Sequence, residues 1–244
     1  MAAKTVQYKH HTFSISYEIV NPSAHYDIVF LHGWGSHKNL MKHAFGSHLS
    51  AFRHIYIDMP GFGNSTCNMA LTTDDYATII ESFLPQIGVS KSVILGHSFG
   101  GKVATLLNPD LLVLVGSAGI LVPKPFTIRA KIFLFKLLKF TGLSRLRRFF
   151  VAPDAAGLSE PMYETFKQVV NEDFTDKFKA FKGKALLCWG RQDTATPLWT
   201  AEKIVELIPD AHLAEYDGDH YFFLEQGGLV AKEIEKTVLK RLEH

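Results

Sequence analysis

The chain has 244 residues, 47% of them hydrophobic, and a formal net charge of +2 at pH 7. This length suits one large domain, or a core domain with an insertion, and it can bury a full hydrophobic core. A net charge so close to zero gives no electrostatic argument for nucleic acid as a partner. We therefore expect a globular protein that does not bind nucleic acid.

The cysteines, the histidines and the N-terminus exclude several further classes. Cys67 and Cys188 are far apart without CxxC spacing, which excludes a disulfide framework and fits a reducing compartment. The twelve histidines show no HExxH spacing, so we expect neither a metal nor another cofactor. Residues 1–8 lack the apolar segment of a signal peptide, and the chain lacks an apolar run of about 18 residues. The predicted location is the cytoplasm.

Apolar segments separated by turn residues predict alternating strands and helices along most of the chain. Strands are expected at 5–8, 13–19, 27–31, 54–58, 92–95, 111–115, 185–190 and 212–216, and helices at 39–49, 74–87, 102–107, 197–208 and 229–242. The first two strands are expected to pair across His10 and His11, and Thr73 or Asp74 is expected to cap the second helix. The alternation predicts an α/β protein with a mostly parallel, doubly wound sheet.

Residues 123–180 break this alternation, because they show helical periodicity without strands. We interpret this segment as an inserted helical cap, with residues 1–122 and 181–244 forming the core domain. The cap is expected over the carboxyl edge of the strands, where ligands bind in open α/β sheets.

Ser98 lies in a Gly-x-Ser-x-Gly sequence between an apolar strand and a short helix. Strand, sharp turn and helix form the context in which this sequence becomes a nucleophile elbow. Gly96 and Gly100 supply the room that such a turn needs. The alternative is an ordinary serine in a glycine-rich turn, so the rest of the chain has to decide.

A serine hydroxyl needs an adjacent base, and a histidine base needs a carboxylate to orient it. Asp193 follows the strand 185–190 and His220 follows the strand 212–216, so both are expected at the same sheet edge as Ser98. Asp217 and Asp219 are too close to His220 in sequence to orient its ring well. Asp58 also ends a strand, whereas the strand 111–115 is followed by no carboxylate. Asp193 is therefore the predicted acid.

The sequence resembles the α/β-hydrolase superfamily over essentially the whole core. The motifs that carry the resemblance are His32-Gly33-Trp34-Gly35, Asp58-Met59-Pro60-Gly61-Phe62-Gly63-Asn64-Ser65, Gly96-His97-Ser98-Phe99-Gly100-Gly101, Trp189-Gly190-Arg191-Gln192-Asp193-Thr194-Ala195-Thr196-Pro197 and Gly218-Asp219-His220. The order Ser, Asp, His is also the order of that superfamily. The resemblance implies an oxyanion hole made by the backbone N–H groups of Trp34 and Phe99.

The resemblance also bears on the neighbours of these residues. At the position of His32, a histidine in this superfamily more often orders the oxyanion loop than takes part in catalysis. His97 is expected to point to the opposite side of the turn. His32 and Tyr221 are retained as candidate substrate contacts.

Eight basic residues and no acidic ones lie between positions 124 and 150, and they include Arg145, Arg147 and Arg148. One interpretation is a cap helix that is apolar towards the site and solvated outside. The other is a basic surface that recruits an anionic substrate, an acidic carrier protein or a membrane surface, with these three arginines as substrate contacts. Residues 126–150 and 162–166 are expected to set acyl-chain specificity.

The predicted function is hydrolysis of a small carboxylic ester by a serine hydrolase. The alternative is a carbon–carbon bond hydrolase that acts on acidic 2-hydroxy-6-oxo-dienoates, a group that usually has Asn at the position of His97 and Trp at that of Tyr221. A third possibility is a non-catalytic ligand-binding protein with the same fold.

Overall fold

The computed structural model describes residues 2–123 and 157–242 of the chain. The strands are β1 (Ala2–Tyr8), β2 (His11–Val20), β3 (Tyr26–Leu31), β4 (Phe52–Ile57), β5 (Val93–His97), β6 (Leu111–Val115), β7 (Lys184–Gly190) and β8 (Asp210–Tyr216). The helices described are α1 (Lys38–Phe45), α2 (Thr73–Phe83), the 3₁₀ helix η1 (Leu84–Ile87), α3 (Phe99–Leu106), α5 (Glu160–Val169), α6 (Thr175–Ala180), α7 (Leu198–Leu207) and α8 (Phe223–Leu242).

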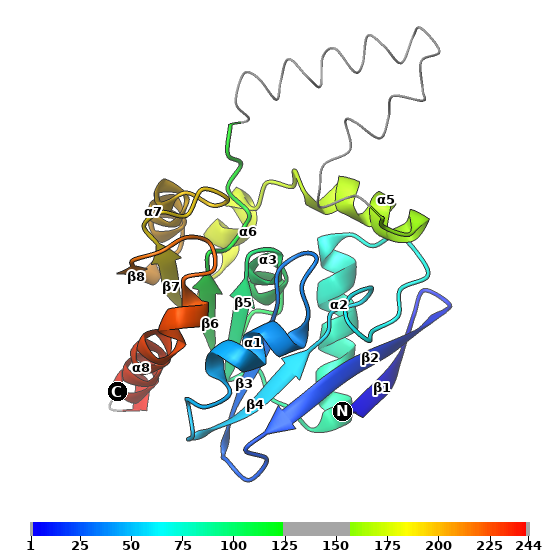
Figure 1. Ribbon diagram of the computed structural model, residues 1–244, viewed down its shortest axis with the longest axis horizontal. Helices are drawn as coiled ribbons and strands as arrows, with labels where there is room; N and C mark the ends of the chain where they lie inside the picture. The colour runs from blue at the N-terminus through cyan, green and yellow to red at the C-terminus, as the bar shows by residue number, and fades with distance from the viewer. Residues whose placement is uncertain (1, 124–156, 243–244) are drawn as a thin grey trace, which may run out of the picture.

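The strands form one eight-stranded sheet with the order β1-β2-β4-β3-β5-β6-β7-β8 (Figure 1). Strands β3 to β8 pair in parallel with one another, whereas β2 pairs antiparallel with both β1 and β4. The predicted fold class, a mostly parallel doubly wound sheet, is therefore confirmed. The expected hairpin is present as well, and Lys9 and His10 turn it with φ angles of 45° and 63°, as two-residue hairpin turns of the primed type require.

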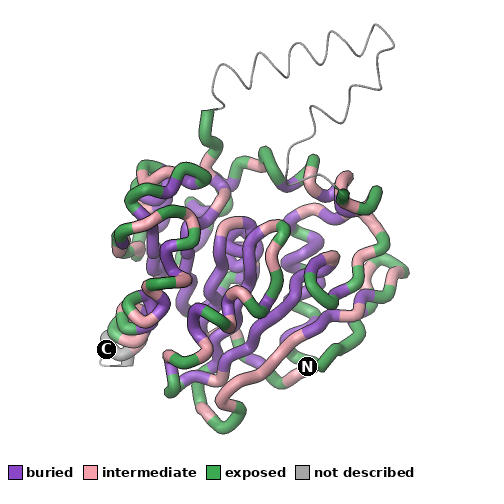
Figure 2. The backbone as a smooth tube through the Cα atoms, in the orientation of Figure 1, coloured by how far each residue is buried: buried purple, intermediate pink, exposed green. Residues whose placement is uncertain are grey.

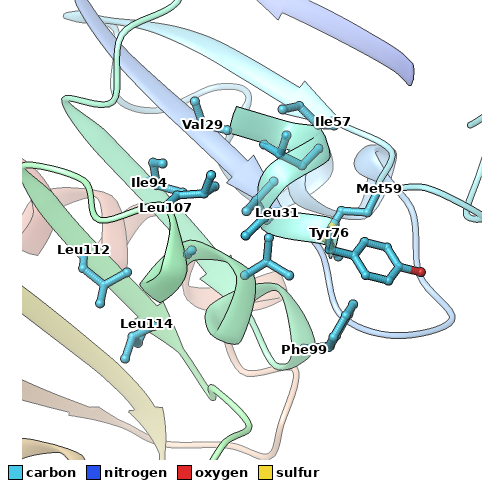
Figure 3. Packing of buried hydrophobic residues seen from close by; sticks show 14 of the residues in the cluster. Val29, Leu31, Ile57, Met59, Tyr76, Ile94, Phe99, Leu107, Leu112 and Leu114 are labelled. Atoms are coloured by element: carbon cyan, nitrogen blue, oxygen red, sulfur yellow. The ribbon is translucent and has the colours of Figure 1, made fainter. Parts of the chain in front are cut away.

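Helices cover both faces of the sheet, and this explains why its central strands are continuous apolar runs. Along β3, Val29 and Leu31 belong to the core under α2 and α3, while Ile28 and Phe30 belong to the core under α1 and α8. Figure 2 shows the central strands of the sheet buried, while the edge strand β1 is mostly exposed. Figure 3 shows the side chains between α3 and the strands, including Phe99 at the start of that helix.

The start and end of α2 differ from the sequence prediction. Thr72, rather than Thr73 or Asp74, is the N-cap, because its side chain and that of Asp75 form a reciprocal capping box. The helix then narrows at Leu84 into η1, which contains Pro85 in its first turn. Proline lacks the N–H that would continue the α-helical ladder.

Two helices, α5 and α6, lie within the predicted cap. Residues 124–156 lie outside the described residues, and so do Arg145, Arg147 and Arg148. The domain boundaries therefore stay predictions. Within residues 2–123 and 157–242, every helix is too short or too polar to cross a lipid bilayer.

Candidate active site

Ser98 lies on the turn between β5 and α3 with a backbone conformation of φ 50° and ψ −115°. Positive φ is rare for a residue with a side chain and indicates local strain held by the surrounding fold. A Cβ added at Gly96 would lie 2.3 Å from the carbonyl oxygen of Gly100, and one at Gly100 would lie 2.4 Å from that of Leu31. The glycines are therefore required, because strand and helix leave no space for a side chain there. The sequence predicted this elbow for these reasons.

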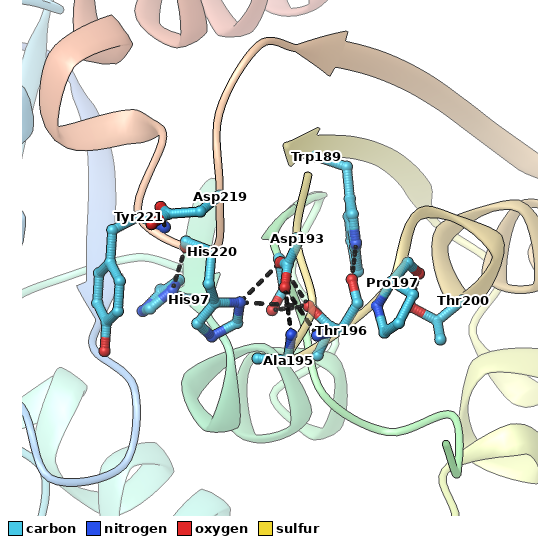
Figure 4. A network of polar contacts seen from close by, with 11 residues as sticks. His97, Trp189, Asp193, Ala195, Thr196, Pro197, Thr200, Asp219, His220 and Tyr221 are labelled. Atoms are coloured by element: carbon cyan, nitrogen blue, oxygen red, sulfur yellow. Dashed lines mark hydrogen bonds and ion pairs between the residues drawn. The ribbon is translucent and has the colours of Figure 1, made fainter. Parts of the chain in front are cut away.

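The loops after β7 and β8 are held against one another by their backbones. The N–H of Arg191 donates to the carbonyl of Tyr216 at 2.8 Å, and that of Gln192 donates to the carbonyl of Gly218 at 2.9 Å. This register brings the carboxylate of Asp193 to the ring of His220, with 2.7 Å between Oδ2 and Nδ1 (Figure 4). Asp193 and His220, predicted to meet at this edge, are in direct contact.

The environment of Asp193 favours its ionised form. Its side chain is fully buried, and its oxygens accept hydrogen bonds from the backbone N–H groups of Ala195 and Thr196, the Thr196 hydroxyl and His220. Burial opposes ionisation, but the hydrogen bond and charge of His220 and the donors of Thr196 outweigh it and hold the pKa of Asp193 below its usual value. The ionised carboxylate therefore accepts a hydrogen bond from Nδ1–H of His220, and Nε2 is the ring nitrogen that remains free of Asp193.

Ser98 lies close to this pair, but the expected hydrogen bond between its hydroxyl and His220 is not formed. A Cβ at Gly116, at the end of β6, would lie 3.2 Å from both Asp193 Oδ2 and His220 Nδ1, and the N–H of Ser98 donates to the carbonyl of Val115. Within the described part of the chain, no hydrogen bond joins the Ser98 hydroxyl to His220. Catalytic hydrogen bonds of this kind are often long without substrate and tighten in the complex.

The loop after β3 closes the other side of the turn. A Cβ at Gly33 would lie 3.2 Å from Cβ of Ser98, and the rings of Trp34 and Phe99 are 5.6 Å apart. The two residues predicted to donate to an oxyanion therefore lie side by side, next to Ser98.

His32 orders this loop. Its Nδ1 donates to the carbonyl of Gly33 at 2.8 Å, and its Nε2 accepts from the N–H of Met59 at 3.0 Å. Burial lowers its pKa to about 4, so the ring is neutral at physiological pH. With a fully buried side chain and both nitrogens engaged, His32 supports the loop and has no free group for substrate.

The structure also places the other residues that the sequence analysis considered for the site. Asp58 forms a salt bridge of 2.5 Å with Lys38, and both side chains are 1% exposed, so this carboxylate is a structural group. Tyr221 is 44% exposed and its ring lies 5.4 Å from that of His220, so it can reach a bound molecule. His97 contacts the His220 loop, with Nε2 at 3.2 Å from the His220 carbonyl oxygen and the two rings 4.7 Å apart. Among residues 2–123 and 157–242, no cluster of His, Cys, Asp or Glu could hold a metal ion.

Sequence reasoning missed three residues that shape the site: Thr196, Gly116 and Lys102. The Thr196 hydroxyl contacts both members of the Asp193–His220 pair, at 2.8 Å and 3.3 Å. A threonine three residues after an aspartate is a signal that could have revealed this bond, because short polar side chains often bond nearby backbone and side-chain groups in loops. A buried Lys102 has no such signal.

Known proteins resemble this chain in sequence and in fold. A model of the alpha/beta hydrolase family matches residues 28–233. Putative esterase/lipase 2 of Mycoplasma pneumoniae is 33% identical over 35% of this chain and 33% of its own length. A pimeloyl-[acyl-carrier protein] methyl ester esterase of Sodalis glossinidius is 27% identical over 69% of this chain and 56% of its own length. The matches thus span a third and about half of these two relatives.

Solved structures share the whole fold. An esterase from Exiguobacterium antarcticum superposes with a TM-score of 0.73 at 22% identity, covering 93% of this chain and 96% of its own. A meta-cleavage product hydrolase from Pseudomonas fluorescens IP01 superposes with a TM-score of 0.69 at 21% identity, covering 96% and 98%. The family match, which spans most of the chain, and the sheet order described above agree: this chain belongs to the alpha/beta hydrolase family.

Proposed function

We propose that the protein is a serine hydrolase that cleaves a small carboxylic ester. The observation that carries this proposal is the buried Asp193–His220 pair, 2.7 Å apart, beside a serine on a strained turn. Several relatives and structural neighbours bear the name esterase, which supports the same reaction class.

In the proposed reaction, the Ser98 hydroxyl attacks the ester carbonyl while Nε2 of His220 takes its proton. Asp193 stabilises the imidazolium that forms, and the N–H groups of Trp34 and Phe99 hold the negative oxygen of the tetrahedral intermediate. The imidazolium then gives its proton to the leaving alcohol. His220 next activates a water molecule, which releases the acid and regenerates Ser98.

Covalent labelling by a fluorophosphonate tests this proposal, since the reagent reacts with an activated serine. Wild-type protein and the Ser92→Ala control should label, because Ser92 lies at the opposite end of β5, whereas Ser98→Ala should not. Ser98→Ala should also lose ester hydrolysis. An unlabelled wild type would favour the non-catalytic ligand-binding protein.

Cleavage of a carbon–carbon bond is the second candidate. The similarity in fold to the meta-cleavage product hydrolase supports it. Two departures from that group, His97 and Tyr221, count against it, and their rings lie 5.3 Å apart. Parallel assays with p-nitrophenyl acetate and a coloured 2-hydroxy-6-oxo-dienoate separate the two reactions. Faster turnover of the dienoate would replace the ester as the proposed substrate.

We also propose that the basic residues of the cap recruit an anionic group, such as an acidic carrier protein or an anionic membrane surface. One relative is named for a substrate on an acyl-carrier protein, which supports the carrier. Replacing Arg145, Arg147 and Arg148 with Ala should remove the salt dependence of kcat/KM for an anionic ester only. An equal response of a neutral ester would refute recruitment.

The cysteines Cys67 and Cys188, both free thiols, support a cytoplasmic location.

A further inference from the structure

His97 is the residue before Ser98, and its side chain is 1% exposed. Its ring packs against three rings from the segment that follows β8: the centroid distances are 4.7 Å to His220, 5.3 Å to Tyr221 and 4.7 Å to Phe223. The side chain therefore links the nucleophile turn to the loop that carries the proposed base (Figure 4).

A hydrogen bond joins His97 to the backbone of that base. Nε2 of His97 lies 3.2 Å from the carbonyl oxygen of His220. A carbonyl only accepts, so Nε2 must carry the proton. Burial lowers the pKa of His97 to about 3, and the ring is therefore neutral with Nδ1 deprotonated.

Nδ1 of His97 is a buried polar atom with no hydrogen-bond partner among the described residues. Leaving such an atom unsatisfied costs about 1–3 kcal/mol, which an apolar side chain of similar size would not incur. A Cβ at Gly33 would lie 3.0 Å from this nitrogen, so the ring also packs directly against the oxyanion loop. The chain thus keeps a histidine where packing alone would favour an apolar residue, and the gain is the bond made by Nε2.

The orientation of the His220 ring, and so the direction of Nε2, is fixed only if both the ring and its backbone are held in place. Asp193 holds the ring by bonding Nδ1, and a second contact has to hold the backbone of residue 220. In the loop itself, the N–H groups of Tyr221 and Phe222 donate to Asp219, but these bonds fix the chain only after His220. The bond from His97 holds the His220 carbonyl directly and ties it to the strand that carries Ser98.

We propose that His97 is a positioning residue, which holds the backbone of His220 so that the imidazole stays aligned with both Asp193 and Ser98. This inference rests on the proposed serine hydrolase function. The residue touches no substrate. Its effect is on the rate of the chemical step, because misplacement of a base by about 1 Å can cost about 100-fold in rate.

The test compares three variants at position 97. His97→Phe keeps a flat ring in the stack but removes the donor, and His97→Leu is a smaller variant without the donor. His97→Gln returns a donor on a flexible chain of similar reach. Phe and Leu should lower kcat by about 10- to 100-fold with KM nearly unchanged, and Gln should recover most of the loss.

His54→Leu is the matched control, because His54 is also fully buried but makes no contact with the described residues of the site. Its ring nitrogens bond the Tyr56 hydroxyl on β4 and the carbonyl of Leu49 in the turn before β4. His54→Leu should lower the thermal midpoint and leave kcat unchanged. Wild-type kcat in folded His97→Phe or His97→Leu overturns the inference, as does a Gln variant that is folded and no faster than Phe. Failure of the wild type to label with a fluorophosphonate overturns the proposed function instead.

Discussion

Lys102 Nζ lies 2.9 Å from a carboxylate oxygen of Glu172 and joins helix α3, which begins directly after Ser98, to the segment after α5. The same ammonium donates to the carbonyl of Val169 at 2.7 Å and lies 4.8 Å from the ring centre of Phe174, while the Lys102 side chain is 2% exposed. The end of α5 is thereby fixed to the helix that begins after Ser98. The buried Lys102 ammonium therefore connects the first described helix of the predicted cap to the helix that follows the Ser98 turn.

Replacing Lys102 with Met should lower the free energy of unfolding by about 1–3 kcal/mol, because the Val169 carbonyl and Glu172 lose the ammonium while remaining partly buried. Of its described partners, the Glu172 carboxylate keeps only the Thr73 hydroxyl. Urea denaturation measures the change. The control is Lys167→Met, which removes a pair with Glu164 whose side chains are 49% and 42% exposed. That substitution should change stability by less than about 0.5 kcal/mol. If both substitutions changed the free energy of unfolding equally, the buried contacts of Lys102 would add no stability beyond that of an exposed ion pair.

Ser98→Gly should be more stable than Ser98→Ala, although both variants lack the proposed nucleophile. Alanine keeps the cost of positive φ at this turn, whereas glycine adopts φ 50° freely. The greater freedom of glycine in the unfolded chain offsets part of this gain. We expect a net difference of about 1 kcal/mol in thermal or urea unfolding. A Gly variant less stable than the Ala variant would mean that the turn is not strained.

Gly116→Ala should lower kcat/KM, whereas its loss of stability should match that of an alanine substitution at another glycine with positive φ. Gly116 has φ 50°, and a new Cβ would lie 3.2 Å from the two atoms of the Asp193–His220 hydrogen bond. Gly88→Ala is the control, since Gly88 has φ 63° but open space around a new Cβ. Both should lose about 1–2 kcal/mol of stability from positive φ. Only Gly116→Ala should reduce kcat/KM, by about 10-fold or more, in an ester assay.

Asp75 should make stability depend on acid pH. Burial opposes its ionisation, but hydrogen bonds from Lys9, the Thr72 backbone and Tyr8 lower its pKa from 3.8 to about 2. A carboxylate with a lowered pKa stabilises the folded state above the unfolded pKa, and this contribution is lost as the pH falls through the folded pKa. The thermal midpoint of Asp75→Asn should therefore fall less steeply than that of the wild type between pH 4 and 2.

Asp74→Asn is the control for this experiment, because the Asp74 side chain is 61% exposed. Its stability curve should run parallel to that of the wild type. Asp27, Asp58 and Asp193 also have lowered pKa values. The thermal midpoint of Asp75→Asn should therefore still fall with pH in acid, but less steeply than that of the wild type. An unchanged slope in Asp75→Asn would contradict the prediction.

The sequence predicted the parts of the fold that depend on repeating patterns. The central strands were recognisable because both faces are covered, so that Ile28, Val29, Phe30 and Leu31 are all apolar. The meeting of Asp193 and His220 was predictable because both follow parallel strands, whose carboxyl ends share one edge. Gly96 and Gly100 marked the tight turn directly.

Features set by single side chains were not predictable in this way. Lys38 and Lys102 look like surface lysines in the sequence, and only the folded chain buries them beside Asp58 and Glu172. Helix α1, expected over 39–49, ends at Phe45, and Leu49 has φ 53° just before β4. The bond from His97 to the His220 carbonyl depends on two loops that are distant in sequence. Such pairings follow from tertiary packing, which local patterns do not encode.

The order of the strands along the chain has a consequence for synthesis on the ribosome. Ser98 follows β5, whereas Asp193 and His220 follow β7 and β8, which are synthesised later. Any nascent chain that still lacks those strands carries the hydroxyl without its base. In the proposed mechanism, the Ser98 hydroxyl therefore cannot be activated before β7 and β8 have been synthesised and have folded.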